Sequence, residues 1–282
     1  MFPTPIEKTS RSWQMTYQAL LPAALVLWLL PLLAVALFSI KPDGDFANAN
    51  YWGMPSSFEG GNNYGKVFFE SDMPRYLLNS VFITVPTVIG AVALSCMTGF
   101  ALGIYRFRAN LWIFFAFVAG NFVPFQILMV PVRDLTLDLG LYNTKTGLVL
   151  FHVAFQTGFC TLFMRNFIRA LPFELIEAAR VEGIAEWRIF WFVVLPLMKP
   201  AIAALSVLIF TFIWNDYFWA VVLTQGVESQ PVTAGITSFN AQYRAAYHLM
   251  SAGSIVAALP PVAMFFLMQK HFIAGLTLGA VK

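Results

Sequence analysis

Charged residues are scarce in this chain. Only 11% of its 282 residues are Asp, Glu, Lys or Arg, whereas a soluble globular domain carries about 25%. Hydrophobic residues make up 59%, and the mean hydropathy is +0.71. One soluble core cannot bury so much apolar surface. The composition therefore excludes an ordinary soluble domain and indicates a polytopic membrane protein.

Residues suited to catalysis, metal binding or redox chemistry are also few. The three histidines are widely separated, and the two cysteines, Cys96 and Cys160, lie in apolar runs without CxxC spacing. The sequence contains no GxxxxGK[ST] phosphate-binding loop, no GxSxG and no HExxH. We therefore expect no enzyme activity, metal site, bound cofactor or nucleic-acid partner. If the function of this protein consumes nucleotide, another chain must hydrolyse it.

Long apolar runs are what the chain does have. A transmembrane helix needs about 20 mainly apolar residues, and six segments qualify: 17–40, 77–104, 111–132, 147–164, 200–223 and 251–269. The uncharged run at 12–40 is 29 residues long, far beyond a signal-peptide core of about 7–15. We therefore expect a retained first span and an all-α membrane protein with six transmembrane helices.

The distribution of Lys and Arg predicts the orientation. With the N-terminus inside, eleven of the 17 Lys and Arg residues fall on the cytoplasmic side. Both termini and the loop at about 165–199 are then cytoplasmic. Residues 41–76 are predicted to form an irregular extracytoplasmic loop with turns. The outer segment at 224–250 is either a docking surface or a loop that merely tolerates polar residues.

Small residues and prolines occur inside the expected spans. Ala91, Ser95, Gly99 and Gly103 follow one another at four-residue intervals, which predicts close packing against another helix. Prolines suggest kinks, which are common around a pathway and in membrane helices generally. They are Pro22, Pro31, Pro86, Pro124, Pro260 and Pro261.

The stretch "EAARVEGIAEWRIFWFVVLP", residues 177–196, is unusually charged for this chain. Pro172 and the acids that follow it predict a helix start. Gly183 permits a sharp turn, and Trp187 begins an aromatic segment that returns to the membrane boundary. The pattern predicts a helix–turn–helix lying against the membrane.

Leu175, Ala178 and Ala179 form a short apolar strip on the first of these helices. Its small side chains would let another protein approach closely. An ordinary amphipathic interfacial helix explains the residues equally well. The physical pattern alone does not decide between these two interpretations.

The same stretch resembles the EAA motif of permease subunits in binding-protein-dependent ABC importers. The matching residues are Glu177, Ala178, Ala179, Gly183, Leu195 and Pro196. Glu182 stands where the family often has Asp. The strings "LLNSVFITV", "GLYNTKTGLVL", "FIWNDYFWAVVL" and "FIAGLTLGAVK" also resemble the maltose-type second permease of carbohydrate ABC importers.

The resemblance implies the type I ABC importer permease fold in a bacterial inner membrane. It implies an N-terminal span and loop at 1–76 and a transporter core at 77–282. The expected partners are a second permease, two ATPase subunits that use ATP and Mg, an extracytoplasmic solute-binding protein and membrane lipid. The residues expected to couple to the ATPase are Glu177, Ala178, Ala179, Glu182, Gly183 and Trp187. The tail at 271–282 is expected to touch the ATPases as well.

Polar residues inside the spans are candidates for the solute pathway. They are Asn121, Gln126, His152, Gln156, Asn215 and Asp216, with Phe122, Phe125, Phe155 and Tyr217 available to stack on sugar rings. The alternative is structural, with Asn215 and Asp216 capping or bracing the end of a span. The subfamily implies a sugar, a sugar alcohol or a glycerol phosphodiester. A different class, a stand-alone secondary transporter or channel, is disfavoured because charge is nearly absent from the spans.

Overall fold

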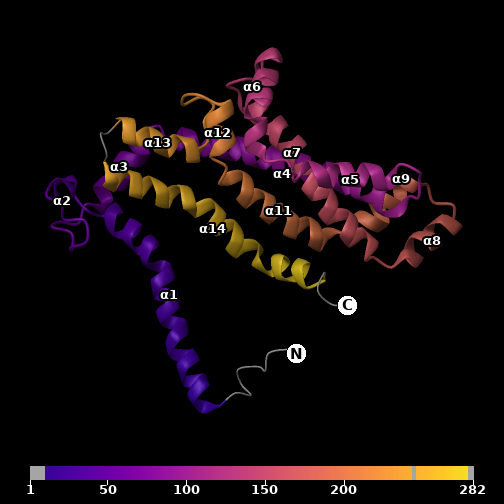
Figure 1. Cartoon of the computed structure of the whole chain (residues 1–282), viewed down its shortest axis with the longest axis horizontal. Coiled ribbons are helices and arrows are strands. Elements are labelled where there is room, and N and C mark those ends of the chain that lie inside the picture. The colour runs from indigo at the N-terminus through magenta and orange to yellow at the C-terminus, as the bar shows by residue number, and fades with distance from the viewer. Residues whose placement is uncertain (1–9, 243–245, 279–282) are drawn as a thin grey trace. The chain divides into compact units, whose positions relative to one another are not determined.

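The computed structural model describes residues 10–242 and 246–278, with side chains for 10–237 and 246–269 (Figure 1). Every regular element in these ranges is a helix, and no strand occurs in them, as expected for an all-α protein. The chain forms two compact units, Met1–Ser71 with Phe239–Val256 and Asp72–Ser238 with Ala257–Lys282. The first unit thus joins two stretches that lie far apart in the sequence.

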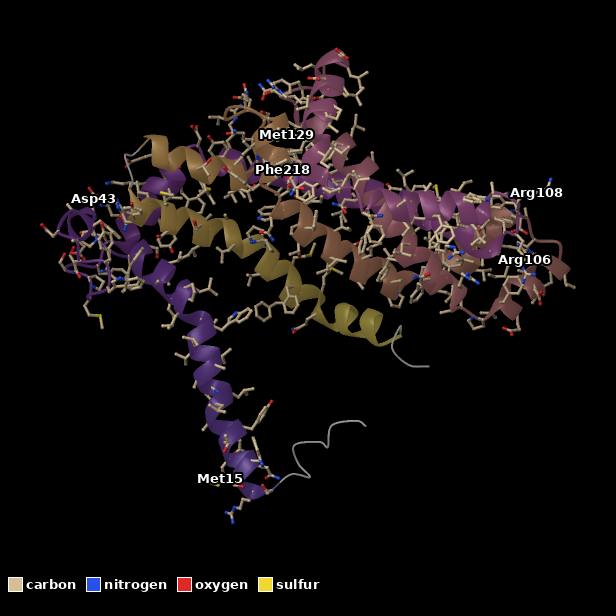
Figure 2. All side chains as sticks on the ribbon, viewed as in Figure 1. Met15, Asp43, Arg106, Arg108, Met129 and Phe218 are labelled. Carbon is tan, nitrogen blue, oxygen red and sulfur yellow. The ribbon has the colours of Figure 1, made fainter. Side chains whose placement is uncertain are left out.

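The first unit begins with the long helix α1 (Arg11–Ser39), in which only Ser39 is buried. Figure 2 shows side chains projecting along its whole length, from Met15 onward. Because the exposed side chains are mostly apolar, this helix suits a lipid environment. The helix runs on through Pro22 and Pro31, which were expected to kink it.

Two short helices follow, α2 (Asp43–Ala47) and α3 (Gly60–Phe69), so the predicted irregular loop is in fact partly helical. Lys41 organises it. This side chain is fully buried, and Nζ donates to the carbonyl oxygens of Asn50 at 2.6 Å and Tyr51 at 3.0 Å. Asn63 donates to the carbonyl oxygens of Ser39 and Lys41 at 3.0 and 2.9 Å. These bonds close the segment over the end of α1.

The start of helix α14 (Tyr247–Leu278) completes the first unit. His248 is buried and stacks on Phe46, with ring centroids 6.1 Å apart. Its Nδ1 lies 3.4 Å from Oδ1 of Asp43. The beginning of α14 and α2 are thereby held together. Pro260 and Pro261 lie inside α14 and do not interrupt it.

The centre of the second unit is the packing of α4 (Met73–Ile104) on α7 (Lys145–Arg169). A Cβ atom added to Gly99 would meet Met164 Cβ at 2.9 Å and the Arg165 nitrogen at 3.0 Å. The hydroxyls of Thr98 and Thr161 lie 2.6 Å apart in the same contact. The stripe of small residues predicted from sequence is therefore the surface on which α7 packs.

The third expected span, 111–132, is not one helix. Helix α5 (Asn110–Gly120) ends before Pro124, and the chain resumes as η2 (Phe125–Leu128) and α6 (Met129–Asp138) at an angle of 89°. Pro124 has no N–H to continue a helical ladder. Pro124, where a kink was expected, lies in this break. Hydropathy did not reveal how sharply the two parts diverge, because it measures average polarity and not helical continuity.

The fifth expected span, 200–223, is also interrupted. Helix α11 (Lys199–Trp214) ends, and α12 (Phe218–Leu223) begins after three residues. Before α11 lie α9 (Glu186–Ile189), the π-helical η3 (Phe190–Val194) and α10 (Leu195–Leu197), bent by 72° from α11. In the described residues, four helices are long and apolar enough to cross a membrane, or six if each bent pair is one span.

The remaining helices are α8 (Phe173–Val181) and α13 (Val232–Gln242). The backbone of α14 reaches Leu278, but side chains beyond residue 269 and all of 279–282 lie outside the described residues. The prediction that the tail at 271–282 touches partner subunits therefore falls on a part of the chain whose side chains are not described.

Candidate functional site

A cavity of about 470 Å³ lies where the two interrupted spans meet α7. Figure 2 labels Met129, the first residue of α6, and Phe218, the first residue of α12. The rings of Phe125 and Phe218 lie 5.2 Å apart. The cavity is lined by Phe125, His152, Phe155, Gln156, Leu208, Thr211, Phe212, Asn215, Asp216, Tyr217, Phe218 and Trp219. It therefore brings together most of the candidate pathway residues.

His152 and Asp216 face one another in this cavity, from α7 and from the break after α11. Nε2 of His152 lies 3.4 Å from Oδ2 of Asp216, and only 1% of His152 is exposed. The Asp216 carboxylate also accepts from the backbone nitrogens of Trp219 at 3.4 Å and Ala220 at 3.1 Å. Asp216 therefore caps α12 while it faces His152, so the structural role considered from the sequence is present. Its role in a solute pathway stays a prediction.

Several buried polar atoms of the cavity have no hydrogen-bond partner among the described residues, although His152 faces Asp216. They are both ring nitrogens of His152 and Nε2 of Gln156. Leaving such an atom unpaired costs about 1–3 kcal/mol. Aromatic rings of Phe155 and Tyr217 lie in the same lining. Unpaired donors and acceptors beside aromatic faces suit a ligand that has both hydroxyl groups and apolar ring faces.

Three candidate pathway residues, Asn121, Phe122 and Gln126, lie outside this cavity. Nδ2 of Asn121 donates to the carbonyl oxygen of Phe117 at 2.7 Å, one turn back on its own helix. The same amide sits close to Gly158 of α7, where an added Cβ would meet it at 3.1 Å. Gln126 is exposed and does not line the cavity. Asn215 does line it, although its Nδ2 donates to Thr211 of α11 at 2.9 Å.

The charged loop forms the helix–turn–helix that its pattern predicted. Helix α8 ends with a Schellman motif, because Gly183 donates to the Arg180 carbonyl at 2.9 Å and Ile184 to the Ala179 carbonyl at 3.0 Å. Gly183 has φ = +76°, which a residue with a side chain rarely adopts. The glycine therefore fixes the direction in which the chain leaves α8.

The two alanines of the motif lie on different faces of α8. Glu177 and Ala178 are exposed, as is Val181 at 87%. Ala179 is only 7% exposed and belongs to the core with Ile176. The expectation of one outward strip holding both alanines is corrected here. The small Ala179 side chain lets α8 pack closely on the core of its own chain, whereas Ala178 is exposed and available to a partner.

Glu186 ties this loop to the end of α4. Its carboxylate accepts from the Tyr105 hydroxyl at 2.7 Å, and from Nε and a terminal nitrogen of Arg180 at 2.6 and 3.1 Å. Burial, and then the bond to Glu186, raise the pKa of Tyr105 to about 12. The bond to Glu186 also raises the pKa of Arg180. The loop is thus held as one body with α4 by three side chains.

Sequence reasoning missed the bond between Tyr105 and Glu186. It also missed a second set of hydrogen bonds, made by Asn79 and Asn143 near the beginnings of α4 and α7. Oδ1 of Asn143 accepts from the Gln225 nitrogen at 2.6 Å and from the Ser229 hydroxyl at 2.5 Å. Nδ2 of Asn79 donates to the carbonyl oxygens of Val227 and Gln230 at 2.8 and 2.9 Å. Both asparagines lie in strings that carried the family resemblance. They hold the segment that follows α12, next to the cavity.

Known proteins match this chain over most of its length. The family described as "Binding-protein-dependent transport system inner membrane component" matches residues 71–277. The osmoprotective compounds uptake permease protein of Synechocystis sp. is 32% identical, covering 91% of this chain and 88% of that protein. The arabinooligosaccharides transport system permease protein of Halalkalibacterium halodurans is 32% identical, covering 89% and 90%.

The fold also matches a solved structure. This is the crystal structure of a bacterial ABC transporter involved in the import of the acidic polysaccharide alginate, with a TM-score of 0.82 and 23% identity. The match covers 95% of this chain and all of that chain. The two chains therefore share a fold.

Proposed function

Because the chain belongs to the family of binding-protein-dependent transport inner membrane components, we propose that it forms half of the pathway of a carbohydrate importer. A second, related permease supplies the other half, and separate ATPase subunits hydrolyse ATP. Relatives whose names specify oligosaccharide transport support a carbohydrate as solute. The osmoprotective compounds uptake permease among the relatives extends the class to osmoprotective solutes.

The observation that carries the proposal is the cavity beside the broken helices. Irregular backbone at membrane depth is tolerated where it is buried in protein or lines a water-filled space. Transporters place solute sites at such breaks. Here the break before α12 puts Asp216 opposite His152, and Gln156 presents an unpaired amide to the same space. The cavity volume of about 470 Å³ falls within the range of ligand sites, about 300–1,000 Å³.

Coupling to ATP hydrolysis is proposed to run through the α8 loop. Its exposed face carries Glu174, Glu177, Ala178, Val181 and Glu182. In this proposal Glu177 and Glu182 contact basic groups of the ATPase, and Ala178 allows close approach. Trp187, 58% exposed, contacts the same partner. Ala179 and Gly183 act through the shape of the loop. Its bond to α4 supports a rigid connector between two sites, which coupling requires.

The orientation follows from the same assignment. The α8 loop and both termini lie in the cytoplasm, which agrees with the bias of Lys and Arg. The segment with α2 and α3 lies outside, where a solute-binding protein docks. The side-chain clamp made by Asn79 and Asn143 lies on that outer side too.

Reconstitution of the assembled importer tests the proposal. We expect uptake of labelled oligosaccharide into vesicles to require ATP, the binding protein, both permeases and the ATPase. Gln156→Ala should raise the KM of uptake about fivefold, the equivalent of one hydrogen bond. Asn121→Ala, outside the cavity, serves as the matched control. Uptake by this chain alone would show a stand-alone transporter instead.

A further inference from the structure

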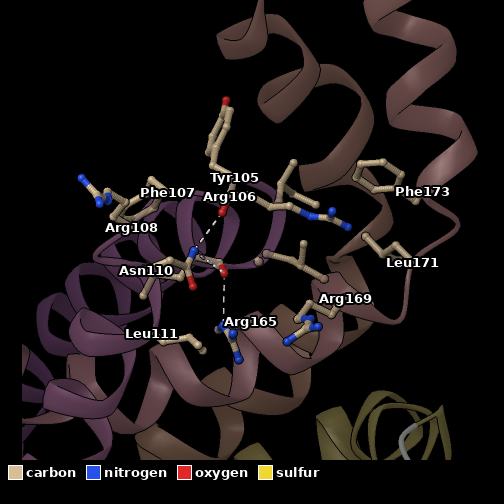
Figure 3. A pocket seen from close by; sticks show the side chains of 14 residues that line it. Tyr105, Arg106, Phe107, Arg108, Asn110, Leu111, Arg165, Arg169, Leu171 and Phe173 are labelled. Atoms are coloured by element: carbon tan, nitrogen blue, oxygen red, sulfur yellow. Dashed lines mark hydrogen bonds between the residues drawn. The ribbon is translucent and has the colours of Figure 1, made fainter.

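A second cavity, of about 700 Å³, lies at the opposite end of α7 from the candidate solute site. It is formed by the end of α4, the connection to α5, and the end of α7 with the residues before α8. Figure 3 shows this region. Four of its lining residues are arginines, Arg106, Arg108, Arg165 and Arg169, and none is acidic. The proposed solute pathway does not use this cavity.

The arginines gather without counter-charge. None of them forms an ion pair with an acidic side chain within the described ranges. Arg165 and Arg169 lie one turn apart on α7, an arrangement in which like charges repel. Figure 3 shows these two guanidinium groups next to each other, with Arg108 pointing away. Like charges held together in this way favour an anion between them.

Arg165 is held in place by the protein itself. Its side chain is buried, Nε donates to the Leu102 carbonyl at 3.1 Å, and the guanidinium lies 3.9 Å from the centre of the Phe114 ring. Asn110 donates to the same Leu102 carbonyl at 3.1 Å and to the Tyr105 carbonyl at 2.8 Å. The cavity wall is therefore ordered before any ligand binds. A guanidinium fixed in this way is suited to phosphate oxygens.

Apolar residues around the arginines indicate a membrane boundary. Leu111 is 57% exposed and Trp112 is 79% exposed, at the start of α5, and Phe107 precedes them. Trp is enriched at the level of lipid head groups. Helices α4 and α7, which end at the cavity, both qualify as membrane spans. A ligand in this cavity would meet guanidinium groups and bilayer-facing apolar side chains together.

We propose that this cavity binds the phosphate group of an anionic phospholipid. The guanidinium groups of Arg106, Arg165 and Arg169 contact the phosphate, and the acyl chains lie along Leu111 and Trp112. Free phosphate would supply the same anion, but it would leave the exposed apolar residues beside the cavity uncovered. Basic pockets between transmembrane helices are suited to such head groups. The bound lipid would stabilise the end of α4, next to Tyr105.

Native mass spectrometry of the full chain and of the assembled importer, purified from membranes with equal phosphatidylglycerol and phosphatidylethanolamine, tests this. We expect wild type to retain phosphatidylglycerol preferentially. The double variant Arg106→Gln, Arg169→Gln removes two exposed cations. Retention of phosphatidylglycerol should therefore weaken about thirtyfold. Arg11→Gln with Arg188→Gln removes as much charge outside the cavity and should retain the lipid. Arg165 stays unchanged because of its structural bond to Leu102.

Several results would overturn the proposal. Equal retention of the two lipids, or unchanged retention in the cavity variant, would exclude a specific anionic-lipid site. An equal loss of phosphatidylglycerol from the control variant would show that retention depends on general surface charge and not on this cavity. Displacement by excess inorganic phosphate would identify a soluble anion as the ligand. Retention by the single chain but not by the assembled importer would assign the arginines to a protein partner.

Discussion

The hydroxyl of Tyr105 donates to Oε2 of Glu186 across 2.7 Å, although the two residues are 81 positions apart in the chain. Tyr105 follows the last residue of α4, and Glu186 begins α9. Arg180 of α8 bonds both oxygens of the same carboxylate. Any displacement of the α8 loop must therefore move the end of α4 with it, or break these bonds.

Tyr105→Phe tests whether this connection transmits movement. The variant removes the hydroxyl but keeps the ring that packs on Phe100. We expect a loss of about 1 kcal/mol in stability and fewer solute molecules transported per ATP hydrolysed. The measurement is the ratio of uptake to ATPase rate in reconstituted importer. Tyr17→Phe, in the exposed part of α1 and outside both the loop and the cavity, is the control. An unchanged ratio would mean that the connection has no part in coupling.

Ala178→Asp tests the exposed face of α8. The substitution adds a charge on the surface that already carries Glu174 and Glu177, without touching the buried Ala179. We expect normal insertion into the membrane and reduced copurification with the ATPase, as seen by quantitative pull-down. Ala178→Ser has a similar size and no charge, so it should behave as wild type. Full copurification of the Asp variant would place the ATPase contact elsewhere.

Gly99→Ala tests the packing of α4 on α7. The new Cβ would lie 2.9 Å from Met164 Cβ and 3.0 Å from the Arg165 backbone. Overpacking of this kind typically costs about 1–3 kcal/mol, so the melting temperature of the purified chain should fall. Gly120→Ala is the matched control, because an added Cβ there meets nothing within 4 Å. Because alanine has a higher helix propensity than glycine, Gly120→Ala should not lower the melting temperature. A fall in both variants would therefore show that the contact at Gly99 is not the cause.

Substitutions of Asn143 separate its backbone role from its side-chain role. Asn143 has φ = +59°, and its Oδ1 accepts two hydrogen bonds. Asn143→Gly tolerates this backbone but loses the acceptor, whereas Asn143→Ala also incurs about 1–2 kcal/mol of left-handed strain. Thermal unfolding should rank wild type above Gly and Gly above Ala. Asn143→Asp keeps an acceptor and should stay near wild type. Equal melting temperatures would show that the clamp adds no stability.

Features that depend on nearby residues could be predicted from the sequence. The long helices, the stripe around Gly99 and the turn at Gly183 each follow from spacing or from one residue's conformational freedom. Most of the cavity could also be predicted, because polar residues are so few in the spans. Five of the seven candidates in the pathway set, which included Phe125, line it.

Features that depend on contacts between distant residues, or on where a helix breaks, could not be predicted fully from the sequence. Pro124 indicated a kink in the third span, but hydropathy did not reveal that α5 ends at Gly120 or that α11 ends at Trp214. Glu186 finds its partner Tyr105 only after the chain has folded. Ala178 and Ala179 are identical in type and adjacent in sequence, and only the packing of α8 decides which is buried.

The division of the chain into units bears on its biosynthesis. The first unit combines the segment that precedes α4 with Phe239–Val256, which is made much later. Chains emerge from the ribosome N-terminus first, so His248 reaches Phe46 and Asp43 only after the whole central part has been inserted. The segment around Lys41 must therefore wait, incomplete, through most of translation. Completion of this unit therefore follows synthesis of the central part of the chain.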